Sequence, residues 1–417
     1  MTAQPLATPT SVSDVLGAPS HGLFVDKKPR TRWQVCTAKP VEYEVLMTEA
    51  VFDPANPDLL GARDARFSPR RLVVTDETVE RLYGRSLRHY LSANGIEHEV
   101  LVLPAGEVNK SLQATELVVA AMDRFGIDRR REPVIAVGGG VLLDIVGFAA
   151  SLYRRSTPFI RVPTTLIGLV DAGVGAKTGV NANGHKNRLG TYFPAQRTLL
   201  DRSFLRTLPM RHVSNGLAEI LKIALIKDVH LFDLLEVAGP TLLTSALQAP
   251  ASPDQPDLAL EVIEAAIDGM LQELQPNLWE QVLERCVDYG HAFSPTIEMQ
   301  ALPALLHGEA VSIDMAFTTV LAERRGLLSI EQRQRIFAVM RTLQLPVHHP
   351  LLTEEVLLSA LADTVRHRDG KQRLPLPIGI GRHYFVDDVS AEEISAAITS
   401  LQHAAVHIAR QQQRPTR

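Results

Sequence analysis

The 417-residue chain has few cysteines, few aromatic residues and no long hydrophobic run. Its two cysteines, Cys36 and Cys286, lie far apart, which excludes a disulfide framework and makes a reducing, cytoplasmic setting the expected one. The apolar runs are short or interrupted, so no membrane span and no membrane partner are expected. Charge is nearly balanced, at a formal net charge of −4, which argues against nucleic acid as a partner.

The two ends of the chain have the composition of mobile tails. The first residues are rich in Pro, Ser, Thr and Ala and lack the basic and apolar segments of a signal peptide. We therefore expect tails over residues 1–30 and 409–417. Between them, strand and helix patterns alternate up to about residue 205, which predicts a mostly parallel α/β domain over residues 31–205. Helical patterns dominate residues 206–408 and predict a helical second domain.

Caps and turns locate several helices. Ser111 and Gly126 are expected to begin and end one of them. Residues 214–236 have the pattern of one amphipathic helix. Residues 242–261 are rich in proline and aspartate, which predicts a loop between helices.

Three glycines, residues 138–140, follow an apolar strand and precede a helix. Such a turn lets the backbone and the first N–H groups of a helix approach a phosphate. A dinucleotide site and a tight turn without a ligand fit this pattern equally, because it is not G-x-G-x-x-G. Two acids favour the nucleotide. Asp144 lies one turn into the helix, and Asp76 ends an earlier strand, where an acid suits the ribose of NAD better than that of NADP.

A polar segment follows, in which basic side chains lie among small residues and a carboxylate. Its polar members include Asp171, Lys177, Lys186, Asn187 and Arg188. This mixture indicates an anionic, hydroxylated substrate such as a sugar phosphate, or else a polar surface loop. Arg154 and Arg155 form either a second phosphate clamp or an exposed helix end.

Glu219 and Lys222 are three residues apart and share a helix face. Two histidines, His291 and His307, come later in separate segments. Two histidines and one glutamate are typical of a catalytic zinc site with an open position. An ordinary Glu–Lys pair and two unrelated histidines are the alternative.

Taken together, six segments resemble the sugar phosphate cyclases, the dehydroquinate synthase superfamily, in order and spacing. They are GGGVLLDIVGFAASLYRR, RVPTTLIGLVDAGVGAKTGVN, HKNRLG, NGLAEILKIA, YGH and LLHGEAV. The resemblance covers about residues 33–386. It implies an NAD-binding α/β domain, a helical domain, a Zn²⁺ or Co²⁺ ion, and a homodimer.

Carried over position by position, the resemblance implies roles for individual residues. The metal ligands would be Glu219, His291 and His307. Substrate-binding and catalytic positions would be Asp171, Lys177, Lys186, Asn187, Lys222 and Asp288, with Arg155 donated across the dimer. The NAD contacts would be Asp76, Glu107, Lys110, Gly139, Gly140, Asp144, Thr164, Thr165, Lys177 and Lys186. A late basic position falls on Lys371 or Arg373.

Three positions bear on the substrate. Dehydroquinate synthases, whose substrate carries a carboxylate, typically have Arg, Asn and His where this chain has Glu284, Asp288 and Pro295. Two acids there would repel a carboxylate, which implies sedoheptulose 7-phosphate. The strings PNLWE and RHRDGKQRLPLPIGIG resemble the 2-epi-5-epi-valiolone synthases of aminocyclitol pathways.

Several alternatives remain at this stage. Within the superfamily they are 2-epi-valiolone, desmethyl-4-deoxygadusol and 3-dehydroquinate synthases, and, less favoured, a 2-deoxy-scyllo-inosose synthase. An NAD- and metal-dependent alcohol dehydrogenase of the glycerol type is an alternative from a different class. It would accumulate NADH, whereas a cyclase would not.

Overall fold

The computed structural model describes residues 22–26, 32–37, 39–61, 68–252 and 254–412. The chain divides into two compact units, Met1–Tyr43 and Glu44–Arg417. In the first unit, β1 (Gly22–Asp26) pairs antiparallel with β2 (Arg32–Cys36). Of the two predicted tails, residues 22–26 form β1 and residues 409–412 end helix α12, and the other tail residues lie outside the described ones.

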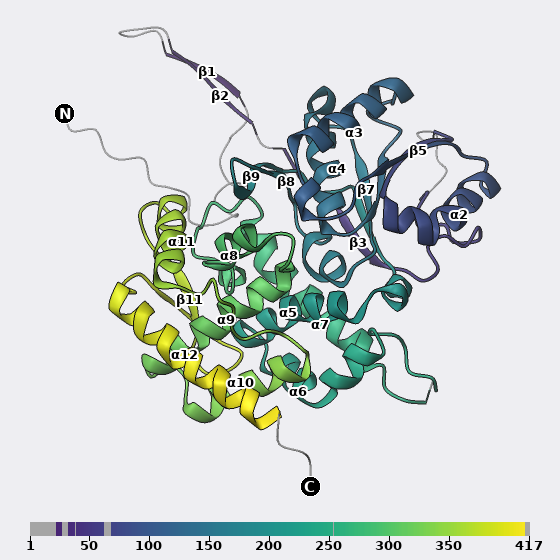
Figure 1. Ribbon diagram of the computed structural model, residues 1–417. Helices are drawn as coiled ribbons and strands as arrows, with labels where there is room; N and C mark the ends of the chain where they lie inside the picture. Colours follow the sequence, from purple (N-terminus) through teal and green to yellow (C-terminus); the bar gives the residue numbers. More distant parts are fainter. Residues whose placement is uncertain (1–21, 27–31, 38, 62–67, 253, 413–417) are drawn as a thin grey trace. The chain divides into compact units, whose positions relative to one another are not determined.

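The second unit contains a six-stranded parallel sheet (Figure 1). Side by side, its strands are β3 (Glu44–Met47), β10 (Arg197–Leu200), β7 (Phe159–Pro163), β6 (Val134–Gly138), β4 (Arg70–Asp76) and β5 (Glu97–Leu103). This confirms the predicted α/β class.

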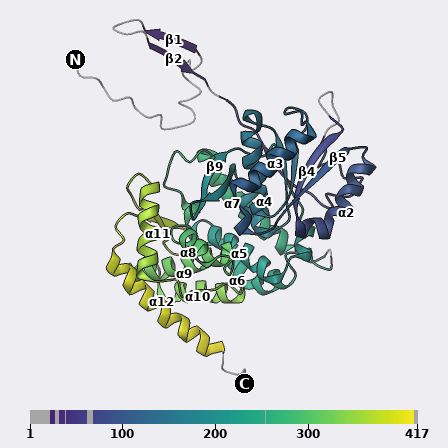
Figure 2. The same cartoon turned by 45° about the horizontal axis from the view of Figure 1, so that its top comes forward.

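Helices cover both faces of this sheet, because successive strand residues point to opposite sides. Leu72 and Val74 of β4 pack with α3 (Leu112–Phe125) and α4 (Gly140–Leu152). Val73, between them, packs with α2 (Glu77–Ala93) on the other face. Figure 1 and Figure 2 show α3 and α4 on one side of the sheet and α2 on the other.

Local caps explain where these helices begin and end. Ser111 Oγ accepts the N–H of Ala114 at the start of α3, and Gly126 ends this helix with φ of 65°. Both predicted boundaries are confirmed. At the end of β4, Asp76 Oδ1 accepts the N–H groups of Thr78 and Val79 and so caps α2.

An antiparallel hairpin, β8 (Lys177–Ala182) with β9 (His185–Tyr192), lies between the sheet layers and the helices that follow. It contacts α4 on one side and α8 (Ser294–Ala301) on the other. The polar segment predicted from the sequence is therefore mostly hairpin rather than open loop. This placement brings its side chains to the helical part of the chain.

The helical part shares one hydrophobic core. Besides α8, its helices are α5 (Met210–Ile226), α6 (Val229–Thr244), α7 (Leu258–Leu274), α9 (His307–Arg324), α10 (Ile330–Thr342), α11 (Glu354–His367) and α12 (Ala391–Gln412). A short hairpin, β11 (Leu374–Pro377) with β12 (His383–Val386), packs among them. Sheet and helices belong to one compact unit, so the domain boundary at residue 205 stays a prediction.

One predicted helix is wrong in extent. Residues 214–236 form parts of two helices, α5 and α6, because Asp228 begins a new helix by accepting the N–H of Leu231. The predicted loop 242–261 is confirmed in place but is shorter, since α6 ends at Thr244 and α7 begins at Leu258.

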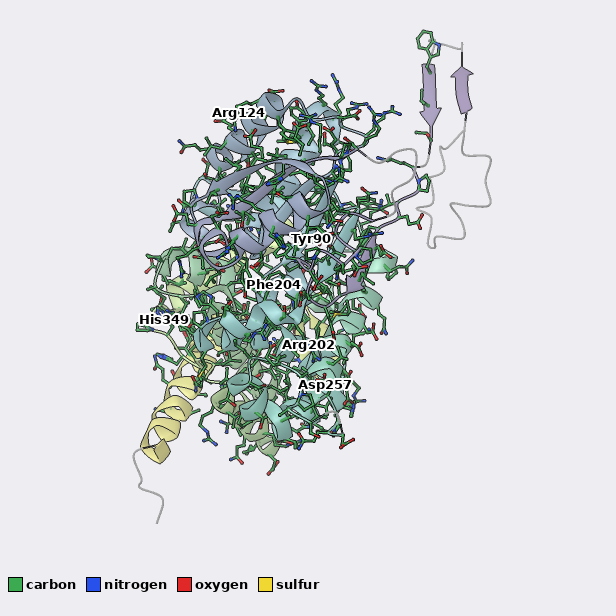
Figure 3. All side chains as sticks on the ribbon, turned by 90° about the vertical axis from the view of Figure 1, so that its right-hand side faces the viewer. Tyr90, Arg124, Arg202, Phe204, Asp257 and His349 are labelled. Atoms are coloured by element: carbon green, nitrogen blue, oxygen red, sulfur yellow. The ribbon has the colours of Figure 1, made fainter. Side chains whose placement is uncertain are left out.

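Two contacts tie the end of the sheet to its surroundings (Figure 3). The Arg202 guanidinium donates to both carboxylate oxygens of Asp257, the cap of α7, at 2.9 and 2.5 Å. Phe204 packs edge-to-face against Phe52, which also contacts Tyr90 of α2. No described helix is long and apolar enough to cross a membrane.

Candidate active site

Glu219, His291 and His307 converge although they come from separate segments. Glu219 lies in the middle of α5, His291 follows a 3₁₀ turn (Cys286–Asp288), and His307 is the first residue of α9. Glu219 Oε1 lies 3.7 Å from His291 Nε2 and 3.3 Å from His307 Nε2. One ligand atom from each residue can be chosen so that all three lie within 4.8 Å of one another.

The local sequence explains why α5 and α9 approach so closely. Asn215, one turn before Glu219 on α5, accepts the N–H of Gly308 through Oδ1 at 2.6 Å. A Cβ at Gly308 would lie 1.9 Å from the Asn215 carbonyl oxygen, so only glycine fits there. Glu309, the next residue, pairs with Arg211 at 2.6 and 2.7 Å. It is therefore a structural acid and not a ligand.

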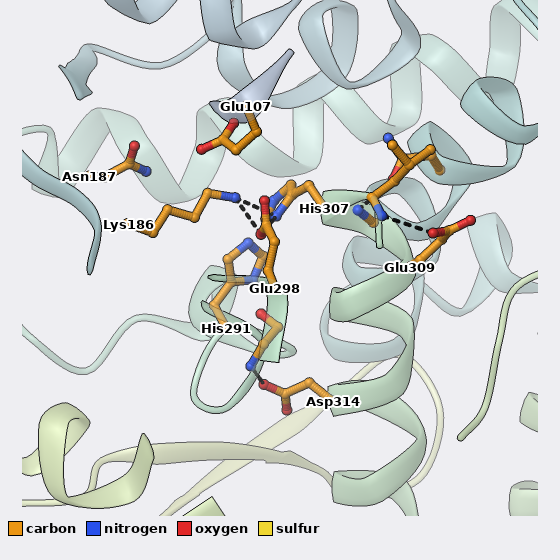
Figure 4. Close-up of polar contacts among 12 residues, drawn as sticks. Glu107, Lys186, Asn187, His291, Glu298, His307, Glu309 and Asp314 are labelled. Atoms are coloured by element: carbon orange, nitrogen blue, oxygen red, sulfur yellow. Dashed lines mark hydrogen bonds and ion pairs between the residues drawn. The ribbon is translucent and has the colours of Figure 1, made fainter. Parts of the chain in front are cut away.

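Asp314, also on α9, holds the segment that carries His291. Its Oδ2 accepts the N–H groups of Phe293 and Ser294 at 2.6 and 2.9 Å (Figure 4). His291 Nδ1 lies 3.1 Å from the carbonyl oxygen of Tyr289, which leaves Nε2 facing Glu219. Burial raises the pKa of Asp314 to about 6.

The donor set fits a divalent cation. Glu219 is 1% exposed, and among the described residues neither of its oxygens accepts a hydrogen bond of good geometry. Lys222 Nζ lies 2.6 Å from Oε2 as an ion pair. Burial alone would raise the pKa of Glu219, but Lys222 and the two imidazoles outweigh it and hold this pKa well below the ordinary value. One carboxylate and two imidazoles are a common catalytic zinc set.

The two imidazoles differ in proton affinity. Burial and the charge of Lys222 lower the pKa of His291 to about 4. Burial and the charge of Lys186 also lower the pKa of His307. Glu298 and Glu219 outweigh them and raise this pKa to about 9. Each imidazole must be deprotonated at the nitrogen that binds a cation.

Glu298 was not predicted from the sequence. It lies on α8, is 1% exposed, and its Oε2 lies 2.6 Å from Lys186 Nζ and 2.9 Å from His307 Nδ1 (Figure 4). Burial would raise its pKa, but Lys186 and His307 lower it. An acid seven residues after His291 in a short helical pattern was the available signal. The spacing does not reveal its partners.

Several predicted NAD positions also come together. Lys110 Nζ donates to Asp144 Oδ2 and to Asn187 Oδ1, both at 2.6 Å. Glu107 Oε1 accepts from the side chain of Asn181 on β8 at 2.8 Å. Three predicted residues are thus joined directly, and Glu107 is tied to the same hairpin.

The glycine turn has the predicted strand–turn–helix form. A Cβ at Gly139 would lie 3.0 Å from Thr165 Cγ2, so the turn packs closely on the next loop. The N–H of Thr164 donates to the Gly138 carbonyl oxygen at 3.0 Å. A Cβ at Gly138 would lie 3.2 Å from Asp76 Oδ2, which places Asp76 beside the turn. Gly140 begins α4 next to Ala172.

Asp288 is paired rather than free. Arg285 Nη1 lies 3.0 Å from its Oδ1, and Arg368 Nη2 lies 3.1 Å from its Oδ2. Burial would raise the pKa of Asp288, but Arg285, Lys177 and Arg368 lower it. Glu284 is exposed. Two guanidinium groups therefore balance the charge of Asp288, and the repulsion of a substrate carboxylate by Asp288 and Glu284 stays a prediction.

Neither candidate for the late basic position, Lys371 or Arg373, pairs with Asp288 through an ion pair in the described part of the chain. Lys371 is exposed, and the backbone N–H of Arg373 donates to Asp387. Arg368, which was not predicted, is the residue of this segment that pairs with Asp288.

The remaining predicted residues differ in how closely they approach the cluster of Glu219, His291 and His307. Asp171 sits in a π-helical turn (Gly168–Ala172), and its charge helps to raise the pKa of Lys222 against the effect of burial. Lys177 is about half exposed and pairs with Glu280. Arg155 is exposed with φ of 65°, and no described hydrogen bond or ion pair joins it to the other predicted site residues. Its role across a dimer stays a prediction.

Comparison with known proteins decides the family. A model of the 3-dehydroquinate synthase N-terminal region matches residues 100–215, and a model of the C-terminal region matches residues 216–366. The chain belongs to the 3-dehydroquinate synthase family. It is 60% identical over 382 residues to a 2-epi-5-epi-valiolone synthase from Actinoplanes sp., covering 91% of this chain and 96% of the relative.

Two solved structures of the family are similar. ValA, a 2-epi-5-epi-valiolone synthase from Streptomyces hygroscopicus subsp. jinggangensis with NAD⁺ and Zn²⁺ bound, has a TM-score of 0.84 at 54% identity, covering 89% of this chain and 100% of ValA. A 2-deoxy-scyllo-inosose synthase complexed with carbaglucose-6-phosphate, NAD⁺ and Co²⁺ shares the fold, with a TM-score of 0.71 at 21% identity over 86% of this chain and 96% of that one. The predicted resemblance is thus confirmed. Within the family, the roles of individual residues in this chain stay predictions.

Proposed function

We propose that this protein is a 2-epi-5-epi-valiolone synthase of aminocyclitol biosynthesis. It converts sedoheptulose 7-phosphate to a seven-carbon cyclitol and inorganic phosphate, uses NAD and a Zn²⁺ or Co²⁺ ion, and acts in the cytoplasm as a homodimer. The observation that carries the proposal is the cluster of Glu219, His291 and His307 with two lysines beside it. The 60% identity to a valiolone synthase supports the same substrate class.

Loss of phosphate and ring closure change no net oxidation state. When bound, NAD accepts and returns a hydride, and the divalent cation polarises substrate oxygens. The expected cation ligands are Glu219, His291 and His307. The expected dinucleotide contacts are the glycine turn with Asp76, Glu107, Lys110, Asp144, Thr164 and Thr165.

The chain itself supplies positive charge where the reaction develops negative charge. Lys222 is 2% exposed and lies beside Glu219, and Lys186 lies beside His307. A departing phosphate and an enolate oxygen are both anionic, and a buried ammonium group stabilises them more strongly than an exposed one. Burial lowers the pKa of Lys222, but the charges of Glu219 and Asp171 outweigh burial and raise it.

Incubation with sedoheptulose 7-phosphate, NAD⁺ and Co²⁺ or Zn²⁺ tests the proposal. We expect release of one phosphate per cyclitol with no accumulation of NADH. Steady NADH accumulation on a polyol without phosphate release would identify a dehydrogenase instead. NMR of the product distinguishes 2-epi-5-epi-valiolone from 2-epi-valiolone and desmethyl-4-deoxygadusol. Efficient turnover of 3-deoxy-arabino-heptulosonate 7-phosphate would instead indicate a 3-dehydroquinate synthase.

A further inference from the structure

Glu298 is a buried acid that touches both a proposed ligand and a proposed active-site lysine. Figure 4 shows its carboxylate between Lys186 and His307. Its Oε2 lies 2.6 Å from Lys186 Nζ and 2.9 Å from His307 Nδ1, and Lys186 Nζ itself lies 2.8 Å from Nδ1. Two acids on the neighbouring helix α9, Glu309 and Asp314, have partners elsewhere. Glu298 is thus the carboxylate that meets the outer nitrogen of His307.

The identity of the atoms around Nδ1 decides which group can orient the imidazole. A histidine that binds a cation through Nε2 must carry its remaining proton on Nδ1. Of the two groups next to Nδ1, the Lys186 ammonium can only donate, so the Glu298 carboxylate is the acceptor. We infer that Glu298 is a positioning residue. It holds His307 with Nδ1–H toward α8 and Nε2 toward Glu219, and it keeps Lys186 beside the imidazole.

This inference rests on the proposed function only for the role of Lys186. The orientation of His307 follows from the distances alone. Without the carboxylate, the ammonium would face Nδ1 with no anion between them. Nδ1 would then accept from Lys186, the proton would move to Nε2, and that nitrogen could no longer bind a cation. Because Glu298 is 1% exposed, water cannot readily replace it.

Glu298→Gln tests the inference, because it keeps the side-chain size and removes the charge. After dialysis against a chelator, each variant is titrated with Co²⁺ in the absence of substrate. We expect the Kd for Co²⁺ to rise about 10- to 100-fold in Glu298→Gln, the usual effect of removing such an outer partner of a ligand histidine. Glu323→Gln is the matched control, since Glu323 pairs with Arg333 at the far end of α9.

Lys186→Gln gives a second test that does not depend on the folding of Glu298→Gln. It leaves the carboxylate in place, so Co²⁺ affinity should be retained. A folded Glu298→Gln protein with the Kd of the wild type overturns the inference, as does a large loss of affinity in Lys186→Gln. Because no substrate is present, failure of the wild type to release phosphate would refute the proposed function and leave this result standing.

Discussion

Replacement of Gly308 by alanine tests whether the contact between α5 and α9 sets the ligand geometry. The new Cβ would lie 1.9 Å from the carbonyl oxygen of Asn215, whereas ordinary contact begins at 3.4 Å. The start of α9 must therefore move by about 1.5 Å (3.4 − 1.9). His307 Nε2 lies 3.3 Å from Glu219 Oε1, and both must reach one ion at about 2.0–2.2 Å. After a shift of that size, His307 Nε2 and Glu219 Oε1 could no longer bind the same ion.

We expect Gly308→Ala to lower the free energy of unfolding by about 1–3 kcal/mol, the usual cost of overpacking. We also expect it to lose tight Co²⁺ binding. Urea unfolding and Co²⁺ titration measure the two effects separately. Gly84→Ala is the control, because its Cβ would meet only the flexible end of Glu80. Its stability should change by less than about 1 kcal/mol, because the displaced carboxylate takes part only in a partly exposed ion pair with Arg88. Wild-type stability and wild-type Co²⁺ affinity in Gly308→Ala would refute the reasoning.

Three further outcomes are expected. The pKa of Asp314 is raised from 3.8 to about 6 in the folded protein. The protonated carboxyl therefore stabilises the fold fully below pH 3.8, and this contribution is lost as the pH rises through 6. Asp314→Asn should abolish this pH-dependent decrease in the free energy of unfolding, which amounts to about 3 kcal/mol. A variant with the pH–stability profile of the wild type would contradict this prediction. Arg368→Met should cost about 1–3 kcal/mol in urea unfolding, because the buried Asp288 then loses one of its two guanidinium partners. A cost near zero would show that this ion pair is unimportant. His291→Ala should abolish Zn²⁺ retention measured by elemental analysis while circular dichroism stays unchanged, and full zinc occupancy would rule this ligand out.

Local sequence signals predicted the elements that local contacts determine. Ser111 and Gly126 act within one turn of α3, so residue type was sufficient to find the ends of that helix. The glycine turn at Gly139 was predicted for the same reason. One helix was predicted where there are two, because the cap formed by Asp228 lies within a continuous amphipathic pattern.

Contacts between distant segments could not be found in this way. The metal trio was predicted through the family resemblance, and the structure brings the three residues together. Glu298 and Arg368 were missed, because their partners lie on other elements of the fold and only packing brings them into contact. Asp288 was found, but its charge was treated as free, since a sequence does not show the two guanidinium groups that neutralise it.

The shared use of α5 constrains which substitutions the protein can tolerate. This one buried helix carries Glu219, the proposed carboxylate ligand, together with the adjacent lysine and the Asn215 amide that caps α9. A substitution there changes folding and cation geometry at once, so the two effects cannot be selected independently. Asp288 and its partners Arg285 and Arg368 lie in a 3₁₀ turn and in loop segments outside α5. If the proposed roles hold, substitutions near Asp288 can change substrate preference without disturbing α5, whereas substitutions at the proposed cation site cannot.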